Sequence, residues 1–152
     1  MKFSATGMYL LKLSEGFRSR VYRDANGLST IGYGHRLLPT ETFPNGIDEQ
    51  HAAALLTLDV CASEEAVERL VKVPLTQGQF DALVDFCFNL GRGRLTASSL
   101  LADLNAGKYD EAARQLLLWD HADGHEIAAL KARREAEAVL WRGNEKPSQV
   151  TA

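Results

Sequence analysis

Apolar residues recur three and four positions apart over most of the chain, a spacing that predicts amphipathic helices. Local signals bound these segments: Gly16 follows the first one, and Pro74 precedes a capping-box sequence from Thr76 to Gln79. We expect helices over about residues 4–15, 48–72, 76–90, 98–105, 110–120 and 126–141.

A different pattern separates the first two helices. The segments Arg18–Asp24 and Leu28–Gly34 are rich in Val, Tyr, Thr and Ile, and Asn26-Gly27 between them favours a tight hairpin turn. The sequence carries no other persuasive sheet signal. We expect an α+β fold that is predominantly α-helical, with a small N-terminal lobe containing a β-hairpin, a long connecting helix and a helical C-terminal lobe.

The length is consistent with one domain made of two lobes. A chain of 152 residues with 45% hydrophobic content can bury a core without a cofactor or a disulfide. We expect a single domain over 1–152, with the first lobe at about 14–60, the first helix packing on the second lobe, the second lobe at about 72–143 and a polar tail over 144–152.

Charge is distributed unevenly along the chain. Residues 1–47 carry six Lys or Arg against three Asp or Glu, whereas residues 48–110 carry five against ten. The first segment would therefore favour an anionic partner, and a scatter of solvated charges is the alternative.

Neither a membrane span nor an export signal is apparent. The apolar run Gly7–Leu13 is far shorter than the roughly 20 residues that cross a bilayer, and Lys12 interrupts it. Cys61 and Cys87 lie in helix-like apolar patterns, where buried thiols are common, so we expect synthesis in a reducing cytoplasm. Whether the two cysteines ever pair is left open.

Three residues near the hairpin could carry chemistry. Glu15 ends the first helix, Asp24 opens the turn and Thr30 lies on the returning strand. Glycoside hydrolysis needs one protonated carboxyl and one carboxylate, and a hydroxyl beside them can hold water. Glu15 lies among apolar neighbours and is the better acid, while Asp24 at a polar turn should stay ionised. A helix-end Glu and a turn-opening Asp are also routine structural choices.

The full string around these residues is more specific. It reads Glu15-Gly16, Tyr22-Arg23-Asp24, Gly27 and Thr30-Ile31-Gly32-Tyr33-Gly34-His35. Further blocks follow as Val73–Gln77, Gln79–Leu83, Phe86–Gly91, Ser98–Leu101, Leu104–Gly107 with Tyr109, Arg133–Glu137 and Leu140-Trp141. In this order the sequence closely resembles the phage-type lysozymes, bacteriophage endolysins that degrade bacterial peptidoglycan.

The resemblance implies a lysozyme-like fold and a muramidase that cleaves the β-1,4 bond between N-acetylmuramic acid and N-acetylglucosamine, causing host cell lysis. The catalytic Glu, Asp and Thr of the family match Glu15, Asp24 and Thr30. Glu15 would be the general acid, Asp24 the base or electrostatic stabiliser, and Thr30 would hold water. The family is expected to invert the anomeric centre, which requires carboxyl groups roughly 6.5 to 9.5 Å apart.

Seven further positions are candidates for substrate binding, and some of them have a structural alternative. Gly32, Tyr33 and Gly34 would let the hairpin backbone approach the glycan, or mark a bend in the strand. The resemblance places Phe88, Asn89 and Gly91 on an opposite wall of the cleft, and Ser98 at a polar cleft position. Phe88 could equally be core, and Ser98 a helix cap.

His35 follows the glycines, and we expect a structural role, paired with an acid such as Asp59. His121 and His125 have the spacing of a zinc pair, but Ala122 stands where the metalloprotease motif needs Glu and Gly124 interrupts the helix, so no metal is expected. We also expect no cofactor, nucleic-acid partner or stable membrane insertion.

The remaining expectations concern partners and rivals. The enzyme would reach peptidoglycan from the host cytoplasm through a holin-type pore and act in the periplasm or cell wall as a monomer. A sequence pI near 5.8 departs from the basic character of many phage lysozymes. A lytic transglycosylase and a non-catalytic peptidoglycan-binding module are the alternatives.

Overall fold

The computed structural model describes residues 1–143, and the predicted polar tail lies outside them. The chain divides into two compact units. One takes Tyr9–Ala62 and is called the sheet unit; the other takes Met1–Met8 together with Ser63–Ala152 and is called the helical unit. Helices α1 (Ala5–Glu15) and α2 (Glu49–Leu70) each continue from one unit into the other.

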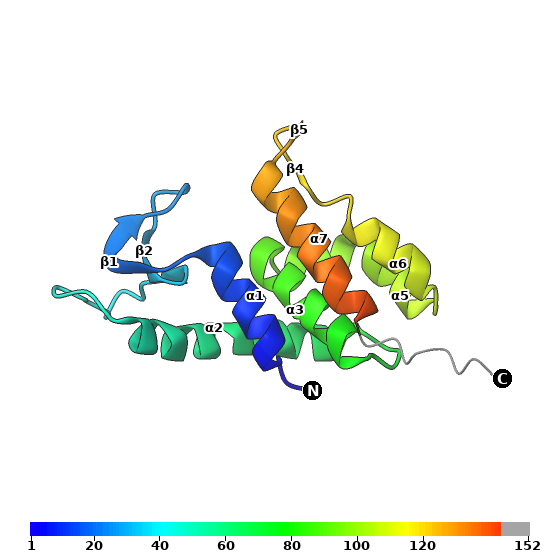
Figure 1. Ribbon diagram of the computed structural model, residues 1–152, viewed down its shortest axis with the longest axis horizontal. Coiled ribbons are helices and arrows are strands. Elements are labelled where there is room, and N and C mark those ends of the chain that lie inside the picture. The colour runs from blue at the N-terminus through cyan, green and yellow to red at the C-terminus, as the bar shows by residue number, and fades with distance from the viewer. Residues whose placement is uncertain (144–152) are drawn as a thin grey trace. The chain divides into compact units, whose positions relative to one another are not determined.

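The sheet unit contains three short antiparallel strands in the order β1 (Arg18–Arg23), β2 (Ser29–Gly32) and β3 (His35–Arg36), of which Figure 1 labels β1 and β2. The predicted hairpin is β1–β2. The sequence predicts one returning strand over Leu28–Gly34 and does not predict β3. The β1–β2 register slips between Arg18 and Tyr22, which pair with Gly32 and Thr30. Ile31 in β2 is buried, as are Ala52, Leu56 and Val60 in α2. A Cβ at Gly32 would lie 3.1 Å from the Ala52 Cβ, so the sheet packs on that helix.

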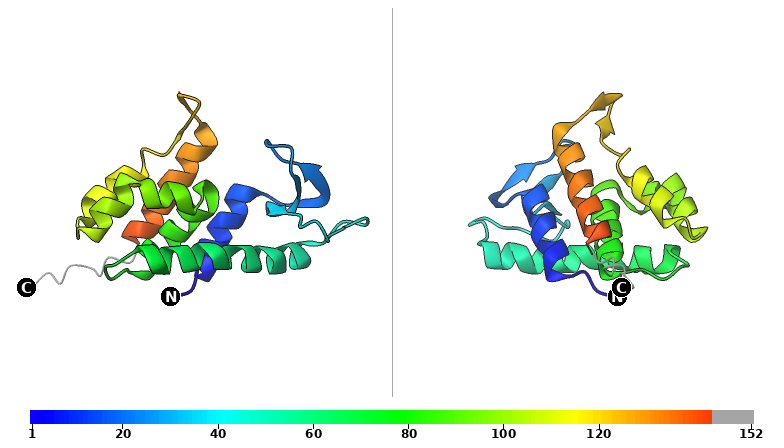
Figure 2. Two further views of the ribbon diagram at one scale, coloured as in Figure 1. Left: turned by 180° about the vertical axis from the view of Figure 1, so that it is seen from behind. Right: turned by 45° about the vertical axis from the view of Figure 1, so that its right-hand side comes forward.

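The helical unit is built around α3 (Gln77–Leu90). The predicted capping box is present, because the Thr76 side chain accepts from the Gln79 amide and the Gln79 side chain accepts from the Thr76 amide. Every residue of α3 from Gly78 to Cys87 is buried. Helix α3 packs on α7 (Ala128–Arg142), and α5 (Ser99–Asn105) packs on α6 (Tyr109–Leu116) (Figure 2).

One charged pair joins α3 to α7 in the interior, and a second pair lies within α7. Arg133 donates to both carboxylate oxygens of Asp85, at 2.8 and 3.0 Å. Arg134 is fully buried and donates to Glu137 at 2.6 Å. Burial, and then a hydrogen bond with Asp85, raises the pKa of Glu137 far above its ordinary value. Asp85 supplies the counter-charge of Arg133 across the two helices.

The fold class is confirmed: the chain is mainly helical with small antiparallel sheets. Two details differ from the sequence prediction. Helix α4 (Arg92–Ala97) lies in a stretch predicted as a connection. A second hairpin, β4 (His121–Ala122) with β5 (His125–Glu126), lies between two predicted helices, where no strand was predicted, and α6 ends at Leu116, before the predicted end at about residue 120. Asp123 and Gly124 both have positive φ, the backbone of a primed hairpin turn.

The structure also bears on the expectations about membrane spans and thiols. No helix within residues 1–143 combines the length and the apolar character needed to cross a bilayer. Both cysteines are free thiols; Cys87 is buried as expected, and Cys61 is half-buried. Burial raises the pKa of the Cys87 thiol, so it stays protonated near neutral pH.

Candidate active site

Glu15 is the last residue of α1, as predicted, because Gly16 follows it with φ +71° and its amide returns to the Lys12 carbonyl. The half-buried Glu15 side chain lies over Gly34, in the turn between β2 and β3. A Cβ at Gly34 would lie 3.1 Å from Glu15 Oε2 and 3.8 Å from its Cδ. The turn therefore makes room for the carboxyl group by having no side chain there.

Asp24 organises the turn between β1 and β2. Its Oδ1 accepts from the amides of Asn26 and Leu28, both at 2.9 Å, and its own amide donates to the Leu28 carbonyl. Its Oδ2 faces Arg36 Nε at 3.4 Å. Gly27, with φ +76°, completes the turn that Asn26-Gly27 predicted.

These contacts set the charge state of Asp24. The Leu28 amide lowers the pKa of this carboxyl most, and the Asn26 amide and the Arg36 guanidinium add to it, outweighing the opposing effect of partial burial. The carboxylate is therefore ionised at neutral pH, which is the role that the sequence assigned to it.

Thr30 lies at the start of β2 and is 2% exposed. Its hydroxyl donates to the Leu28 carbonyl at 3.0 Å. The same Leu28 peptide groups also bond the amide and the carboxylate of Asp24. Leu28 therefore ties Asp24 and Thr30 together, and the Thr30 oxygen can still accept a hydrogen bond.

Gly32 and Tyr33, predicted to contact substrate, are both buried. A Cβ at Gly32 would lie 3.1 Å from the Ala52 Cβ, so the close approach at this position is to α2. The Tyr33 ring packs 5.6 Å from the Phe17 ring and lies under the Lys12 ammonium at 5.5 Å. Both residues hold the β2–β3 turn in place, and glycan contact at either position stays a prediction.

His35, in β3, lies between two carboxylates. Its Nδ1 is 2.9 Å from Asp59 Oδ2, the partner proposed from the sequence, and its Nε2 is 2.9 Å from Glu41 Oε2. Burial disfavours the charged ring, but the hydrogen bonds and charges of Glu41 and Asp59 outweigh it and raise the pKa of His35. An imidazole ring donates from both nitrogens only when it is protonated, so the two carboxylates favour the charged ring. His35 thereby links β3 to α2 through Asp59 and to the segment that carries Glu41, which is a structural role.

The other four predicted binding residues belong to the helical unit. Asn89, half-buried like Phe88, accepts from Arg134 Nη2 at 2.9 Å. Gly91 is exposed and links α3 to α4 with φ +90°. The buried Ser98 hydroxyl donates to the Leu95 carbonyl and accepts from the Leu101 amide. Ser98 thus has the capping role that the sequence offered as its alternative.

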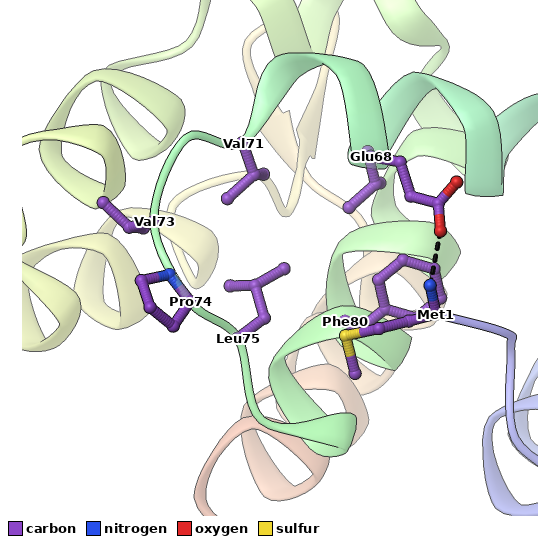
Figure 3. A pocket seen from close by; sticks show the side chains of 8 residues that line it. Met1, Glu68, Val71, Val73, Pro74, Leu75 and Phe80 are labelled. Atoms are coloured by element: carbon purple, nitrogen blue, oxygen red, sulfur yellow. Dashed lines mark hydrogen bonds and ion pairs between the residues drawn. The ribbon is translucent and has the colours of Figure 1, made fainter.

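A hollow of about 260 Å³ in the helical unit contains none of the predicted site residues. Figure 3 shows its apolar lining, with the Met1 ammonium paired to Glu68. A single ion pair among apolar groups offers no acid and base set for catalysis. Among residues 1–143 no group of three His, Cys, Asp or Glu side chains is placed to hold a metal ion.

Sequence reasoning missed two contributors to the site. Leu28 acts through its peptide groups, which no side-chain motif reveals. Arg36 faces Asp24 from β3, twelve residues away in sequence. The contact of Arg36 with Asp24 could have been suspected only from the pairing of β2 with β3, which places Arg36 opposite Thr30.

The fold is mainly helical with a small sheet. The Glu15 carboxyl group lies over the Gly34 turn, and the Asp24 carboxylate is linked through Leu28 to the buried Thr30. This combination is that of the lysozyme-like class. The comparisons with known proteins agree. A family model described as phage lysozyme matches residues 12–137. The chain therefore belongs to the phage lysozyme family.

Individual relatives are similar over most of this chain. An endolysin of Bacillus phage B103 is 40% identical over 144 residues, covering 93% of this chain and 54% of the relative, so the chain spans about half of that protein. An endolysin of Salmonella phage P22 is 37% identical, covering 93% of this chain and 98% of the relative. The solved muramidase domain of SpmX from Asticaccaulis excentricus is 37% identical, with a TM-score of 0.85 over 96% of this chain and 99% of that one. Together they support the predicted class, a peptidoglycan-degrading endolysin.

Proposed function

We propose that this member of the phage lysozyme family hydrolyses the β-1,4 bond between N-acetylmuramic acid and N-acetylglucosamine in peptidoglycan. The observation that carries the proposal is the placement of Glu15 over Gly34 in the same unit that holds the Asp24, Leu28 and Thr30 network. Two carboxyl groups in different surroundings are what glycosidic cleavage requires.

Glu15 serves as the general acid in this proposal. It gives its proton to the leaving oxygen at C4 of N-acetylglucosamine as the bond from C1 of N-acetylmuramic acid breaks. The Gly34 turn restricts the position of the Glu15 carboxyl group, because the glycine backbone lies close to that group and only the absence of a side chain leaves room for it.

Asp24 and Thr30 act on the water. The ionised Asp24 stabilises the positive charge that develops on the sugar ring, and it accepts the proton of the water as the new bond to C1 forms. The Thr30 oxygen accepts the other hydrogen of that water, which orients it. Phe88, Asn89, Gly91 and Ser98 stay predicted glycan contacts on the basis of the resemblance.

The test is the clearing of outer-membrane-permeabilised Gram-negative cells and the release of reducing ends from purified peptidoglycan. Wild type should clear the cells, and Glu15→Gln should lose at least about 100-fold in rate. Glu65→Gln, at an exposed position of α2, is the matched control and should keep full activity. Binding without cleavage by wild type would instead establish the non-catalytic module.

The chemistry of the products separates the finer alternatives. We propose an inverting hydrolase, so the first product observed by NMR should carry the α-anomer at its new reducing end. A β-anomer would show retention, and a 1,6-anhydro end would identify a lytic transglycosylase. Neither outcome would alter the family assignment.

We further propose that the protein acts as a monomer and reaches the wall from the host cytoplasm through a holin-type pore. The likeness to phage endolysins supports this route. Expression in Escherichia coli should leave cells intact until a holin is co-expressed. Lysis without a holin would refute the dependence, and light scattering would test the monomer.

A further inference from the structure

Strand β1 presents three arginines whose charge no carboxylate of the described residues balances. β1 is an edge strand, and Arg18, Arg20 and Arg23 are all exposed. The Arg23 guanidinium donates to the Gly27 carbonyl at 2.9 Å, and that of Arg20 reaches the Pro44 carbonyl at 3.5 Å. Carbonyl contacts position a guanidinium without neutralising it.

Three acidic groups of the sheet unit are engaged by other basic side chains. Asp24 faces Arg36, and Glu41 and Asp59 face His35. Three of the six Lys and Arg residues in positions 1–47 therefore lie exposed on β1. Unpaired guanidinium groups on an exposed strand are suited to binding carboxylates, because the planar fork can donate two parallel hydrogen bonds.

β1 also leads directly into the candidate active site. Arg23 immediately precedes Asp24, and Tyr22 pairs with Thr30. The Arg18 guanidinium stacks 4.6 Å from the Tyr22 ring, which restrains it before any ligand arrives. A polymer bound at Asp24 would therefore have its neighbouring substituents within reach of β1.

We propose that the β1 arginines, chiefly Arg18 and Arg20, bind the carboxylates of the stem peptides that peptidoglycan carries on its N-acetylmuramic acid residues. The inference rests on the proposed function. It makes the enzyme selective for peptide-bearing glycan over the bare polysaccharide, although the chain as a whole is acidic.

The test compares two substrates prepared from one wall sample: peptidoglycan with its stem peptides, and the same glycan after an amidase has removed them. The kcat/KM ratio between the two is measured for wild type and for the double variant Arg18→Gln, Arg20→Gln. We expect the ratio to fall about 3- to 10-fold, mainly through KM on the peptide-bearing substrate. Arg23 is left intact because it contacts the turn of Asp24.

The control removes the same charge elsewhere, with Arg69→Gln and Lys108→Gln at exposed positions of the helical unit. It should leave the ratio unchanged. An equal fall in the control would assign the effect to net charge, and an unchanged ratio in the β1 variant would exclude stem-peptide recognition. Either result overturns the proposal.

Sedimentation with the two polymers separates this proposal from the catalytic one. Wild type and Glu15→Gln should both bind the peptide-bearing polymer more tightly than the bare glycan, and the β1 variant should lose that preference. If wild type binds with this preference but cleaves neither polymer, the catalytic proposal fails and the β1 proposal stands. If wild type cleaves both polymers and binds them without preference, the β1 proposal fails and the catalytic proposal stands.

Discussion

The Glu15 carboxyl group occupies the space that a side chain at position 34 would need, 3.1 Å from the place of a Cβ. Gly34→Ala should therefore push the carboxyl aside by a few tenths of an ångström, and we expect activity to fall about 10-fold, since misplacing a catalytic group by about 1 Å can cost about 100-fold. The φ of +83° adds about 1 kcal/mol of destabilisation. Reducing-end release and urea unfolding measure the two effects.

Gly107→Ala is the matched control for that variant. Gly107 has φ +77°, and a Cβ there would meet nothing within 4 Å. It should lose a similar amount of stability and keep its activity. If both variants lost activity equally, strain in the backbone rather than the position of Glu15 would be responsible.

Asp24→Asn should remove the charge and keep the turn. The amide oxygen of Asn can still accept from the Asn26 and Leu28 amides, so the unfolding free energy should change little. The rate on peptidoglycan should fall about 100- to 10,000-fold, since an amide neither takes a proton nor stabilises a cation. Asp110→Asn, at an exposed position of α6, should be silent. Full activity in Asp24→Asn would exclude the proposed role.

Thr30 can be tested through its hydroxyl group. Thr30→Val keeps the shape but removes the donor to the Leu28 carbonyl and the acceptor proposed for water. We expect a loss of about 1 kcal/mol in stability and at least tenfold in kcat. Thr30→Ser restores the oxygen and should recover most of the rate. An inactive Ser variant of normal stability would contradict a role for the hydroxyl.

His35 makes stability depend on pH in a defined direction. Its pKa is raised in the folded state, so its contribution is complete below the unfolded value of about 6.5 and is lost as pH rises through the folded value. The Tm should fall over that interval in wild type, and His35→Asn should remove this step. The pKa of Glu41 is lowered, first by the Leu38 amide and then by His35, so its contribution is lost in acid. A flat profile in wild type would refute the pairing.

The interior charges of the helical unit predict an asymmetry between two conservative variants. Glu137→Gln keeps the shape of the side chain and an oxygen that can accept from Arg134, and because burial raises the pKa of Glu137, losing its charge should cost less than losing that of Asp85. Asp85→Asn leaves Arg133 buried without its counter-charge and should cost about 3 to 5 kcal/mol. Urea unfolding measures both losses, and equal losses would contradict the asymmetry.

The sequence determined the features that depend on neighbours along the chain. Gly16 ends α1 at Glu15, Asn26-Gly27 forms the hairpin turn, and Thr76 caps α3, because each involves bonds across only a few residues. The Asp123-Gly124 turn was equally local, but the short segments His121-Ala122 and His125-Glu126 beside it lack the apolar alternation of a strand, so the second hairpin was missed. The family string also identified Glu15, Asp24 and Thr30 as candidates.

Only the tertiary structure decided how these candidates are held. The approach of Gly34 to Glu15 joins α1 to the β2–β3 turn, and the contact of Arg36 with Asp24 depends on strand pairing. Glu41 as a second partner of His35, and Ala52 against Gly32, likewise follow from packing. A periodic pattern indicates which face of an element is buried. It does not specify which distant residue meets that face, because that choice is made by close packing of the whole chain.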